Sequence, residues 1–381
     1  MNLVLKSVPS IRHCNRARWN ELTTELPPFL HYDFLQLLET SSSVGSDTGW
    51  LPNYLIVVEQ ESEREVAYIP AFLKEHSYGE YVFDHAWANA YHQHGLAYYP
   101  KLVIAVPFTP VTAKKVLCEV QDLERVVAYL PAAIASYCQQ HHLSSFHWLF
   151  DNSLEGSPKE PLLTQRLSVQ FQWQNNQYTN FDHFLQRFTS RKRKDIRKER
   201  IKVTQQNIRI ERYCNTQITD NLMDFFYRCY QSTYLKRSGH AGYLTADFFS
   251  QLCGMLKDSL MLVLAYQNEQ PIAAALYLYD HTGLYGRYWG SLVDVDSLHF
   301  ECCYYQGIEF AIERQLPLFN PGTQGEHKLL RGFEPIFCQS YHHCCEPAFQ
   351  RAVIDFTEQE RRAVQAYHAQ LQAVVPFKKT E

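Results

Sequence analysis

The sequence predicts an α/β protein built from two domains, each a mixed central sheet flanked by helices. The chain has 381 residues, of which 46% are hydrophobic, and this length exceeds what one hydrophobic core usually organises. A helix followed by two strands that a turn connects is predicted once in each half, which is typical of duplicated domains. We therefore expect domains at residues 1–165 and 166–381, the second ending in a helix.

The first half carries the first copy of this pattern. Apolar residues at helical spacing predict a helix over residues 28–39. Two apolar runs separated by a charged turn predict paired strands over residues 53–60 and 66–74. The second half repeats the same order, with the helix and the two strands predicted over residues 178–188, 261–266 and 272–279.

Charge and cysteine content narrow the class of protein. The formal net charge of −4 argues against extended nucleic-acid binding, which normally needs a basic face. The eleven cysteines are scattered and odd in number, so they indicate no disulfide framework and a reducing, cytoplasmic location. We expect no signal peptide and no membrane span, because no stretch approaches the roughly 20 apolar residues that a span requires.

Titratable side chains are densest between residues 286 and 335. Apolar residues at i, i+3, i+4 and i+7 predict a helix over residues 300–312, and a short buried strand is predicted at residues 318–319. Because titratable groups cluster at functional sites, this density favours a site. Its members are His299, Glu301, Glu309, Glu326, His327, Lys328 and Arg331.

Two long tracts resemble a known family. Residues 298–313 (LHFECCYYQGIEFAIE) and 321–335 (PGTQGEHKLLRGFEP) resemble the FemAB-like family of predicted N-acyltransferases, which is associated with peptidoglycan biosynthesis and recognition. Residues 76–113 resemble its other signature tract. The resemblance implies two tandem acetyltransferase-like (GNAT) domains. It also implies aminoacyl transfer of the kind that Fem enzymes carry out, from tRNA to a cell-wall precursor.

Acyl transfer to an amine needs a base for the ammonium, donors for the oxyanion and an acid for the leaving group. Histidine titrates near neutrality, and a buried glutamate is brought there by a raised pKa. We favour His327 and Glu301 as the base, and a tyrosine supplies the acid in the broader acetyltransferase fold. The candidate catalytic residues are His327, Glu301, His299, Glu326 and Tyr305.

A second set of residues is predicted to bind substrate. Lys328 and Arg331 would hold a phosphate or carboxylate. In the first domain, period-2 alternation places Tyr81, Phe83 and His85 on one face of a predicted strand. The full set of candidates is Tyr81, Asp84, Trp87, Lys101, Thr109, Arg197, Lys198, Arg287, Trp289, Gln324, Lys328 and Arg331.

Each of these assignments has a purely structural alternative. Glu326 would cap a helix, His327 would be a satisfied polar residue and Arg331 would pair with Glu334. The tract around Asp84 would be aromatic core packing with one satisfied carboxylate.

The segment from residue 190 to 202 (SRKRKDIRKERIK) carries eight lysines and arginines against two acidic residues. In the Fem enzymes a comparable tract with an internal Ile-Arg-Lys opens the second domain, and the matching residues are Ile196, Arg197 and Lys198. Basic residues near this tract meet the phosphates of the acceptor. The alternative is a solvated helix stabilised by i, i+4 pairs.

One missing motif and one short run of potential ligands bear on which cofactor or metal the protein would bind. The pyrophosphate loop of ordinary acetyl-CoA acetyltransferases does not occur in the expected place. Residues 342–346 (HHCCE) place adjacent ligands on opposite faces of a strand, so we expect no metal site. We expect no covalently bound cofactor, and acyl-CoA and aminoacyl-tRNA are the two candidate donors.

The sequence thus predicts a cytoplasmic N-acyltransferase that moves an acyl or aminoacyl group to an amine acceptor, a peptidoglycan-related precursor. Its partners would be this small-molecule or precursor substrate and, for the second donor, tRNA. The alternative is a non-catalytic protein that recognises an anionic metabolite or a cell-wall precursor with the same fold.

Overall fold

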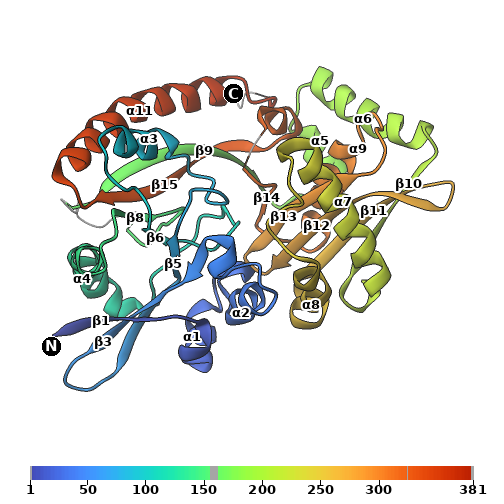
Figure 1. Ribbon diagram of the computed structural model, residues 1–381. Helices are drawn as coiled ribbons and strands as arrows, with labels where there is room; N and C mark the ends of the chain where they lie inside the picture. The colour runs from blue at the N-terminus through green and yellow to red at the C-terminus, as the bar shows by residue number, and fades with distance from the viewer. Residues whose placement is uncertain (1, 155–161, 324, 379–381) are drawn as a thin grey trace. The chain divides into compact units, whose positions relative to one another are not determined.

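The computed structural model describes residues 2–154, 162–323 and 325–378, which form two compact units (Figure 1). Unit 1 consists of Met1–Val169 and Phe337–Tyr367, and unit 2 of Gln170–Ile336 and His368–Glu381. The domain ranges expected from the sequence stay a prediction. The units differ from those ranges in residues 166–169 and 337–367, which belong to the compact unit of the N-terminal half.

Unit 1 contains two sheets. The first has the order β1-β3-β4-β7 and is antiparallel, and in the second β15-β8-β6-β5-β2 follow one another. Only β6 and β8 pair in parallel, so the second sheet is mixed. In chain order the elements are β1 (Leu3–Val8), α1 (Arg16–Thr23), α2 (Tyr32–Thr40), β2 (Trp50–Pro52), β3 (Tyr54–Glu59), β4 (Glu65–Ile69), β5 (Ala71–Lys74), α3 (His85–Gln93), β6 (Lys101–Ile104), β7 (Leu117–Cys118), α4 (Val120–Gln140), β8 (Ser145–Trp148), β9 (Thr164–Gln174), β15 (Glu334–Cys344) and α11 (Pro347–Ala373).

The core of unit 1 lies between α4 and its sheets. Val126, Leu130 and Ile134 recur every four residues along α4 and are fully buried against the strands, together with Ile104 and Trp148. This four-residue spacing puts one apolar stripe of the helix on the core. The predicted helix at residues 28–39 and the predicted strand pair are confirmed as α2 and as β3 with β4 and β5.

The tract around Tyr81 does not form the expected strand. The chain turns through positive φ at Gly79 (80°) and Tyr81 (61°), and α3 begins at His85. Glu80 and Asp84 both bind Lys101 of β6, and this shared partner bends the segment between them into a loop. The alternation read from the sequence was therefore wrong in this tract.

Unit 2 has one mixed sheet of order β10-β11-β12-β13-β14-β9, in which only β13 and β14 are parallel. Helix α7 packs against β12 and β13 (Figure 1). The elements are α5 (Phe181–Gln186), α6 (Ser190–Gln205), β10 (Ile208–Cys214), α7 (Asp220–Ser238), α8 (Ala246–Leu256), β11 (Leu260–Gln267), β12 (Gln270–Asp280), β13 (Gly283–Ser291), α9 (Leu298–Phe300), the π-helical turn η6 (Glu301–Tyr305), α10 (Gln306–Glu313), β14 (Leu318–Asn320) and the 3-10 helix η7 (Glu326–Arg331).

The predicted helix near residue 300 is present as α9, η6 and α10, but a π-helical turn interrupts it. In α10 the predicted stripe is buried as expected, including Ile308 and Ala311. The π turn is wider than an α-helical turn and therefore shifts which residues face the core, so that Glu301 and Cys302 are buried. Such turns occur frequently at functional sites. In the part of the chain that the structure describes, no helix combines the length and apolarity needed to cross a bilayer.

We predict that Gly290→Ala destabilises unit 2 strongly. A Cβ at this position of β13 would lie 1.9 Å from the backbone oxygen of Cys229 in α7, so helix and sheet would have to separate. Overpacking of this kind costs about 1–3 kcal/mol or more. Urea denaturation followed by fluorescence measures the loss.

Gly254→Ala is the matched control, because Gly254 lies in α8 and a Cβ there meets nothing within 4 Å. Alanine is favoured over glycine in a helix by up to about 1 kcal/mol, so this variant should be as stable as the parent or more stable. Equal denaturation midpoints for Gly290→Ala and the parent would contradict the predicted close packing.

Candidate functional site

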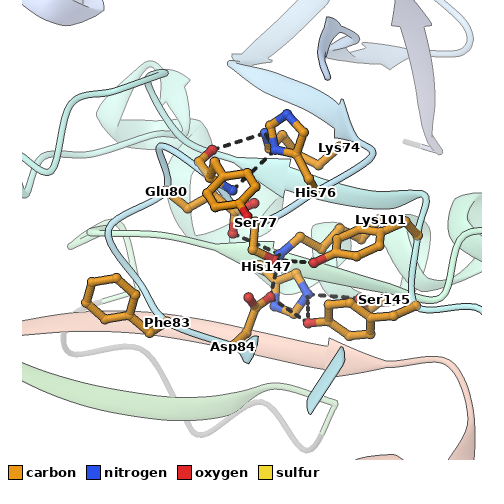
Figure 2. A network of polar contacts seen from close by, with 12 residues as sticks. Lys74, His76, Ser77, Glu80, Phe83, Asp84, Lys101, Ser145 and His147 are labelled. Carbon is orange, nitrogen blue, oxygen red and sulfur yellow. Dashed lines mark hydrogen bonds and ion pairs between the residues drawn. The ribbon is translucent and has the colours of Figure 1, made fainter. Parts of the chain in front are cut away.

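Unit 1 contains a buried ionic cluster centred on Lys101 (Figure 2). The Lys101 Nζ donates hydrogen bonds to Ser77 Oγ at 2.9 Å, to Glu80 Oε2 at 2.9 Å and to the Asp84 carboxylate. All four side chains are buried. The ammonium group thus uses its three N–H donors, and it fixes the loop between β5 and α3 onto the sheet.

Burial and charge oppose each other in this cluster. Burial raises the pKa of Glu80 to about 7, and Lys101 only partly offsets this. Burial also acts to raise the pKa of Asp84, but the Lys101 charge outweighs it and holds that pKa below its usual range. One oxygen of each carboxylate, Glu80 Oε1 and Asp84 Oδ1, is buried without a hydrogen bond. The two acids therefore differ in their proton affinity although they share one lysine.

A chain of hydrogen bonds leads from Asp84 into the sheet. The Tyr98 hydroxyl donates to Asp84 Oδ2 at 2.6 Å and lies 3.1 Å from His147 Nε2. His147 Nδ1 shares a 2.8 Å hydrogen bond with His342 Nδ1. Burial lowers the pKa of His147 to about 3, so this histidine is neutral. The Trp87 ring stacks near His147 and meets His342 edge to face.

Lys74 is the cross-strand neighbour of Lys101, and it too is fully buried. Its Nζ lies 3.9 Å from the centre of the Trp50 ring and 3.3 Å from both His76 Nδ1 and the Tyr78 carbonyl oxygen. Burial lowers the pKa of Lys74 to about 7. Two buried lysines thus lie side by side, and only Lys101 binds carboxylates directly.

Of the predicted binding residues of unit 1, the structure brings Asp84, Lys101 and Trp87 into one cluster. Tyr81 lies half-buried in the loop above it, and the buried Thr109 hydroxyl donates to the Pro107 carbonyl at 3.0 Å. Whether any of them binds substrate stays a prediction. The sequence reasoning missed Ser77, Glu80, Tyr98, His147 and His342, although Glu80 lies in the recognised tract and His342 in the HHCCE run.

Unit 2 contains two arginine–carboxylate clamps, and the first is Arg200 of α6. Its guanidinium binds Glu301 through two bonds of 3.0 and 2.9 Å, and Glu309 through two of 2.6 and 3.2 Å. The Gln306 amide donates to Glu301 Oε1 at 2.8 Å. Glu301 is only 4% exposed. The carboxylate of this predicted base is therefore held in place from two sides.

The second clamp joins Arg331 of η7 to Glu199 of α6. Arg331 Nη2 and Nε donate to the Glu199 carboxylate at 2.6 and 3.1 Å, and Nη1 donates to the His327 carbonyl oxygen at 2.7 Å. The Tyr305 hydroxyl donates to the same carboxylate. Burial and the Glu199 charge raise the pKa of Tyr305, so the phenol keeps its proton. The suggested pairing of Arg331 with Glu334 is not observed, since Glu334 binds Arg187.

Two histidines lie beside the second clamp. His327 is exposed, and its Nε2 lies 2.7 Å from the Tyr304 hydroxyl. Burial, with help from Arg331 and other cations, lowers its pKa. His299 is more enclosed, and burial together with His327 lowers its pKa to about 3. Their ring centres are 5.8 Å apart. Both imidazoles are therefore unprotonated at neutral pH.

Lys328 lies next to these histidines and differs from Arg200 and Arg331, which bind carboxylates. It is only 2% exposed, and its Nζ donates to the Gly322 carbonyl oxygen at 2.6 Å. Within the described residues no carboxylate forms an ion pair with it. Burial lowers its pKa to about 7, against the weaker influence of Cys303. A buried amine that is half unprotonated near neutrality is a marker of functional sites.

Of the remaining predicted residues of unit 2, Trp289 contacts one of the two histidines beside the second clamp. Trp289 of β13 lies 5.6 Å from His299, ring centre to ring centre, and the Arg287 guanidinium lies 5.3 Å from the ring centre of Tyr288. Glu326 is exposed.

On α6, Arg197 pairs with Asp182 at 2.8 Å and Lys198 is exposed. Gln324 lies outside the described residues. The predicted metal-free character stays an expectation, and the described residues contain no group of three or more His, Cys, Asp or Glu side chains placed to hold a metal ion.

Sequence reasoning missed two kinds of residue in unit 2. Arg237, near the end of α7, lies close enough to lower the pKa values of both His299 and His327, yet it is 62 positions before the nearer histidine. Arg200 and Glu199 were read as members of a solvated or phosphate-binding run. Glu199 and Arg200 lie between Ile196 and Val203, the two buried apolar residues of α6. This helical spacing of apolar residues could have indicated that this face of the helix packs against the protein.

Comparison with known proteins gives a family and a fold. The family called FemAB-like, described as peptidoglycan biosynthesis/recognition, matches residues 10–379. No curated protein matches the sequence. Among solved structures, FemX is similar with a TM-score of 0.52 at 10% identity, over 91% of this chain and 99% of that one.

A conserved protein of unknown function from Bacteroides thetaiotaomicron is similar with a TM-score of 0.50 at 11% identity, over 87% of this chain and 97% of that one. A tandem GNAT protein from the clavulanic acid biosynthesis pathway has a TM-score of 0.47 at 9% identity, over 91% and 99% of the two chains. The predicted α/β fold class is confirmed, and the fold is similar to that of FemX.

We predict that Glu80→Gln changes the pH dependence of stability. The folded-state pKa of Glu80 is about 7 and its ordinary value 4.5, so the folded state binds more protons between these values. The parent should lose stability as pH rises from about 4.5 to 7, by on the order of 3 kcal/mol from this group. Relative to the parent, the variant should gain stability between pH 5 and pH 8 in urea denaturation.

Glu61→Gln is the control, because Glu61 is exposed in the same unit and its replacement should leave the pH profile parallel to that of the parent. A Glu80→Gln profile that also runs parallel to the parent would show that Glu80 is ionised normally in the folded protein.

Lys328→Met should remove a different pH dependence. Lys328 has a folded-state pKa of about 7 against an ordinary value of 10.5, so the folded parent binds fewer protons between these values and should gain stability as pH rises from 7 to 10.5. The methionine variant should match or exceed the parent in stability at pH 7 and should lack this gain.

Lys194→Met on the exposed side of α6 is the control. A marked loss of stability at pH 7 in Lys328→Met would contradict the unpaired charge.

Proposed function

The chain belongs to the FemAB-like family, and on this premise we propose that it transfers an acyl or aminoacyl group to the amine of a peptidoglycan-related acceptor. The observation that carries the proposal is the group of nitrogens with lowered pKa values in unit 2, which comprises His299, His327 and Lys328. An acceptor amine arrives as an ammonium ion and must lose a proton before it can attack a carbonyl. A site that holds bases ready at neutral pH supplies this step.

His327 is the proposed general base. It is the exposed member of the group, and its hydrogen bond to the Tyr304 hydroxyl orients the ring. Because its pKa is lowered, the imidazole is free to accept a proton from the acceptor ammonium. His299 packs edge to face on Tyr304 and also contacts His327, so the three rings support one another.

Lys328 is proposed to meet negative charge on the donor or on the tetrahedral intermediate. Within the described residues its Nζ makes one hydrogen bond, so further N–H groups remain for an oxyanion, a phosphate or a carboxylate. Arrival of such an anion would raise the lysine pKa and favour the charged form.

Glu301 and Arg331 fit a positioning role better than direct chemistry. Arg200 and Gln306 donate hydrogen bonds to the Glu301 carboxylate. Arg331 donates hydrogen bonds to the Glu199 carboxylate and to the His327 carbonyl oxygen. The second clamp therefore acts on His327 by fixing the backbone of η7. Tyr305 is engaged in the same clamp.

The donor is proposed to be acyl-CoA or aminoacyl-tRNA, both of which are polyanions. The outer side of α6 exposes Arg191, Lys194 and Lys198, which would attract either. A cytoplasmic location is part of the proposal, and all eleven cysteines are free thiols, as a reducing compartment requires. The second candidate function, recognition of a cell-wall precursor without turnover, is favoured by the engagement of Glu301 and Tyr305 in buried clamps.

We predict that His327→Ala lowers kcat/KM by about 10²–10⁴-fold, the usual contribution of a general base, without a change in melting temperature. Acyl-CoAs and aminoacyl-tRNAs would be incubated with amine-bearing peptidoglycan precursors, and the product identified by mass spectrometry. His92→Ala, which removes an exposed imidazole from α3, should retain full activity. Tight binding of precursor by the parent with no product from any donor would favour the second candidate function instead.

A further inference from the structure

The loop between β5 and α3 exposes a row of aromatic rings. Tyr78 is 61% and Phe83 63% exposed, the highest values for aromatic side chains among the described residues. The exposed His85 lies between them, with ring centres 6.4 Å from Tyr78 and 6.3 Å from Phe83. His76 continues the row at 5.2 Å from Tyr78. We call these four residues the aromatic row.

The backbone beneath the row is fixed, so the rings are not exposed because the chain is loose. The Tyr78 carbonyl oxygen accepts hydrogen bonds from Trp50 Nε1 at 3.1 Å and from Lys74 Nζ at 3.3 Å. The backbone N–H of Tyr78 donates to His76 Nδ1 at 3.2 Å. The Phe83 carbonyl oxygen accepts from Arg166 Nη1 at 2.7 Å. Polar bonds thus hold the main chain while the apolar rings face solvent.

The ionic cluster of Figure 2 completes this support. Glu80 and Asp84, which lie between the exposed rings in the sequence, are both bound to Lys101 below the loop. A buried ion pair is often no more stabilising than an apolar substitute, so stability alone does not account for three buried charges under one short loop. Their consequence here is a loop of fixed shape that presents its aromatic side chains outward.

The charges around the row select the class of ligand. Residues 75–85 contain no lysine or arginine, and Glu75 is exposed. Of the nearby cations, Lys74 and Lys101 are buried beneath the loop, and Arg166 binds Glu360 as well as the Phe83 carbonyl. Among the residues that the structure describes, none of these three cations is free to meet a phosphate. A neutral ligand with an apolar face on a ring suits the surface.

We propose that the aromatic row binds the sugar rings of a glycan, stacking the C–H faces of the pyranoses on Tyr78 and Phe83. This inference rests on the proposed function, in that the acceptor is related to peptidoglycan and therefore carries amino sugars. The row would hold the saccharide part of that acceptor, while the exposed His85 edge offers hydrogen bonds to hydroxyl and acetamido groups.

The test is a titration of the full chain with a soluble β-1,4-linked N-acetylglucosamine tetrasaccharide. Calorimetry and the NMR signals of the aromatic side chains would report binding. The double variant Tyr78→Ala/Phe83→Ala should bind at least tenfold more weakly than the parent. Because both side chains are exposed, the variant should fold normally, which its melting temperature would verify. Tyr367→Ala, an aromatic truncation on α11 of the same unit, should bind like the parent.

Three results would overturn the inference. They are absence of saccharide binding by the parent, equal binding by the parent and the double variant, and binding of uridine diphosphate at the row in preference to the tetrasaccharide. Transfer to a simple amine acceptor that lacks sugars separates this inference from the proposed function. The double variant should keep that activity, whereas failure of the parent to transfer to any acceptor would count against the proposed function and leave the saccharide titration as an independent result.

Discussion

The pairing of three cations, Lys101, Arg200 and Arg331, with carboxylates is the constraint on which the shape of both units depends. A charge removed from water must find an opposite charge and enough hydrogen bonds, or the fold loses several kcal/mol. Arg200 and Arg331 meet this requirement by joining α6 to the helix around η6 and to η7. Lys101 meets it by joining the loop before α3 to β6. In each case one cation fixes a segment whose shape no apolar pattern determines.

Lys328 is the exception that gives unit 2 its chemical character. It is nearly as deeply buried as Lys101, but among the residues that the structure describes its ammonium group bonds only a carbonyl oxygen. The protein thus forgoes the stabilisation that a paired charge would bring, and the lysine and its two histidine neighbours lose protons easily. Strain or instability of this kind is retained where it serves a function, and here it leaves unprotonated nitrogens beside an otherwise fully paired framework.

The sequence predicted the parts of the fold that local periodicity determines. The strand pairs that became β3 with β4 and β11 with β12, and the stripe of α10, follow from residues within one element. Features set by contacts between distant segments could not be predicted. Glu80 and Asp84 turn the chain away from a strand because of Lys101, about twenty residues later.

The candidate site shows the same limit. The density of titratable residues pointed to a segment of unit 2 whose side chains contact one another in the structure, but it did not reveal their partners. Arg200 binds Glu301 but lies 101 residues before it in the sequence. The residues of the helix around position 300 do not indicate that Arg200 is the partner. The protonation state of Lys328 depends on the absence of such a partner, which only the folded structure reveals.

The most direct measurement of the central claim is an NMR titration of the Lys328 side chain in the folded protein, with its ¹³Cε and ¹⁵Nζ resonances assigned by comparison with Lys328→Met. A midpoint near pH 7 would agree with an unpaired, buried amine at the site. A midpoint near the ordinary value of 10.5 would contradict it and would remove the group of unprotonated nitrogens from which the proposed chemistry follows.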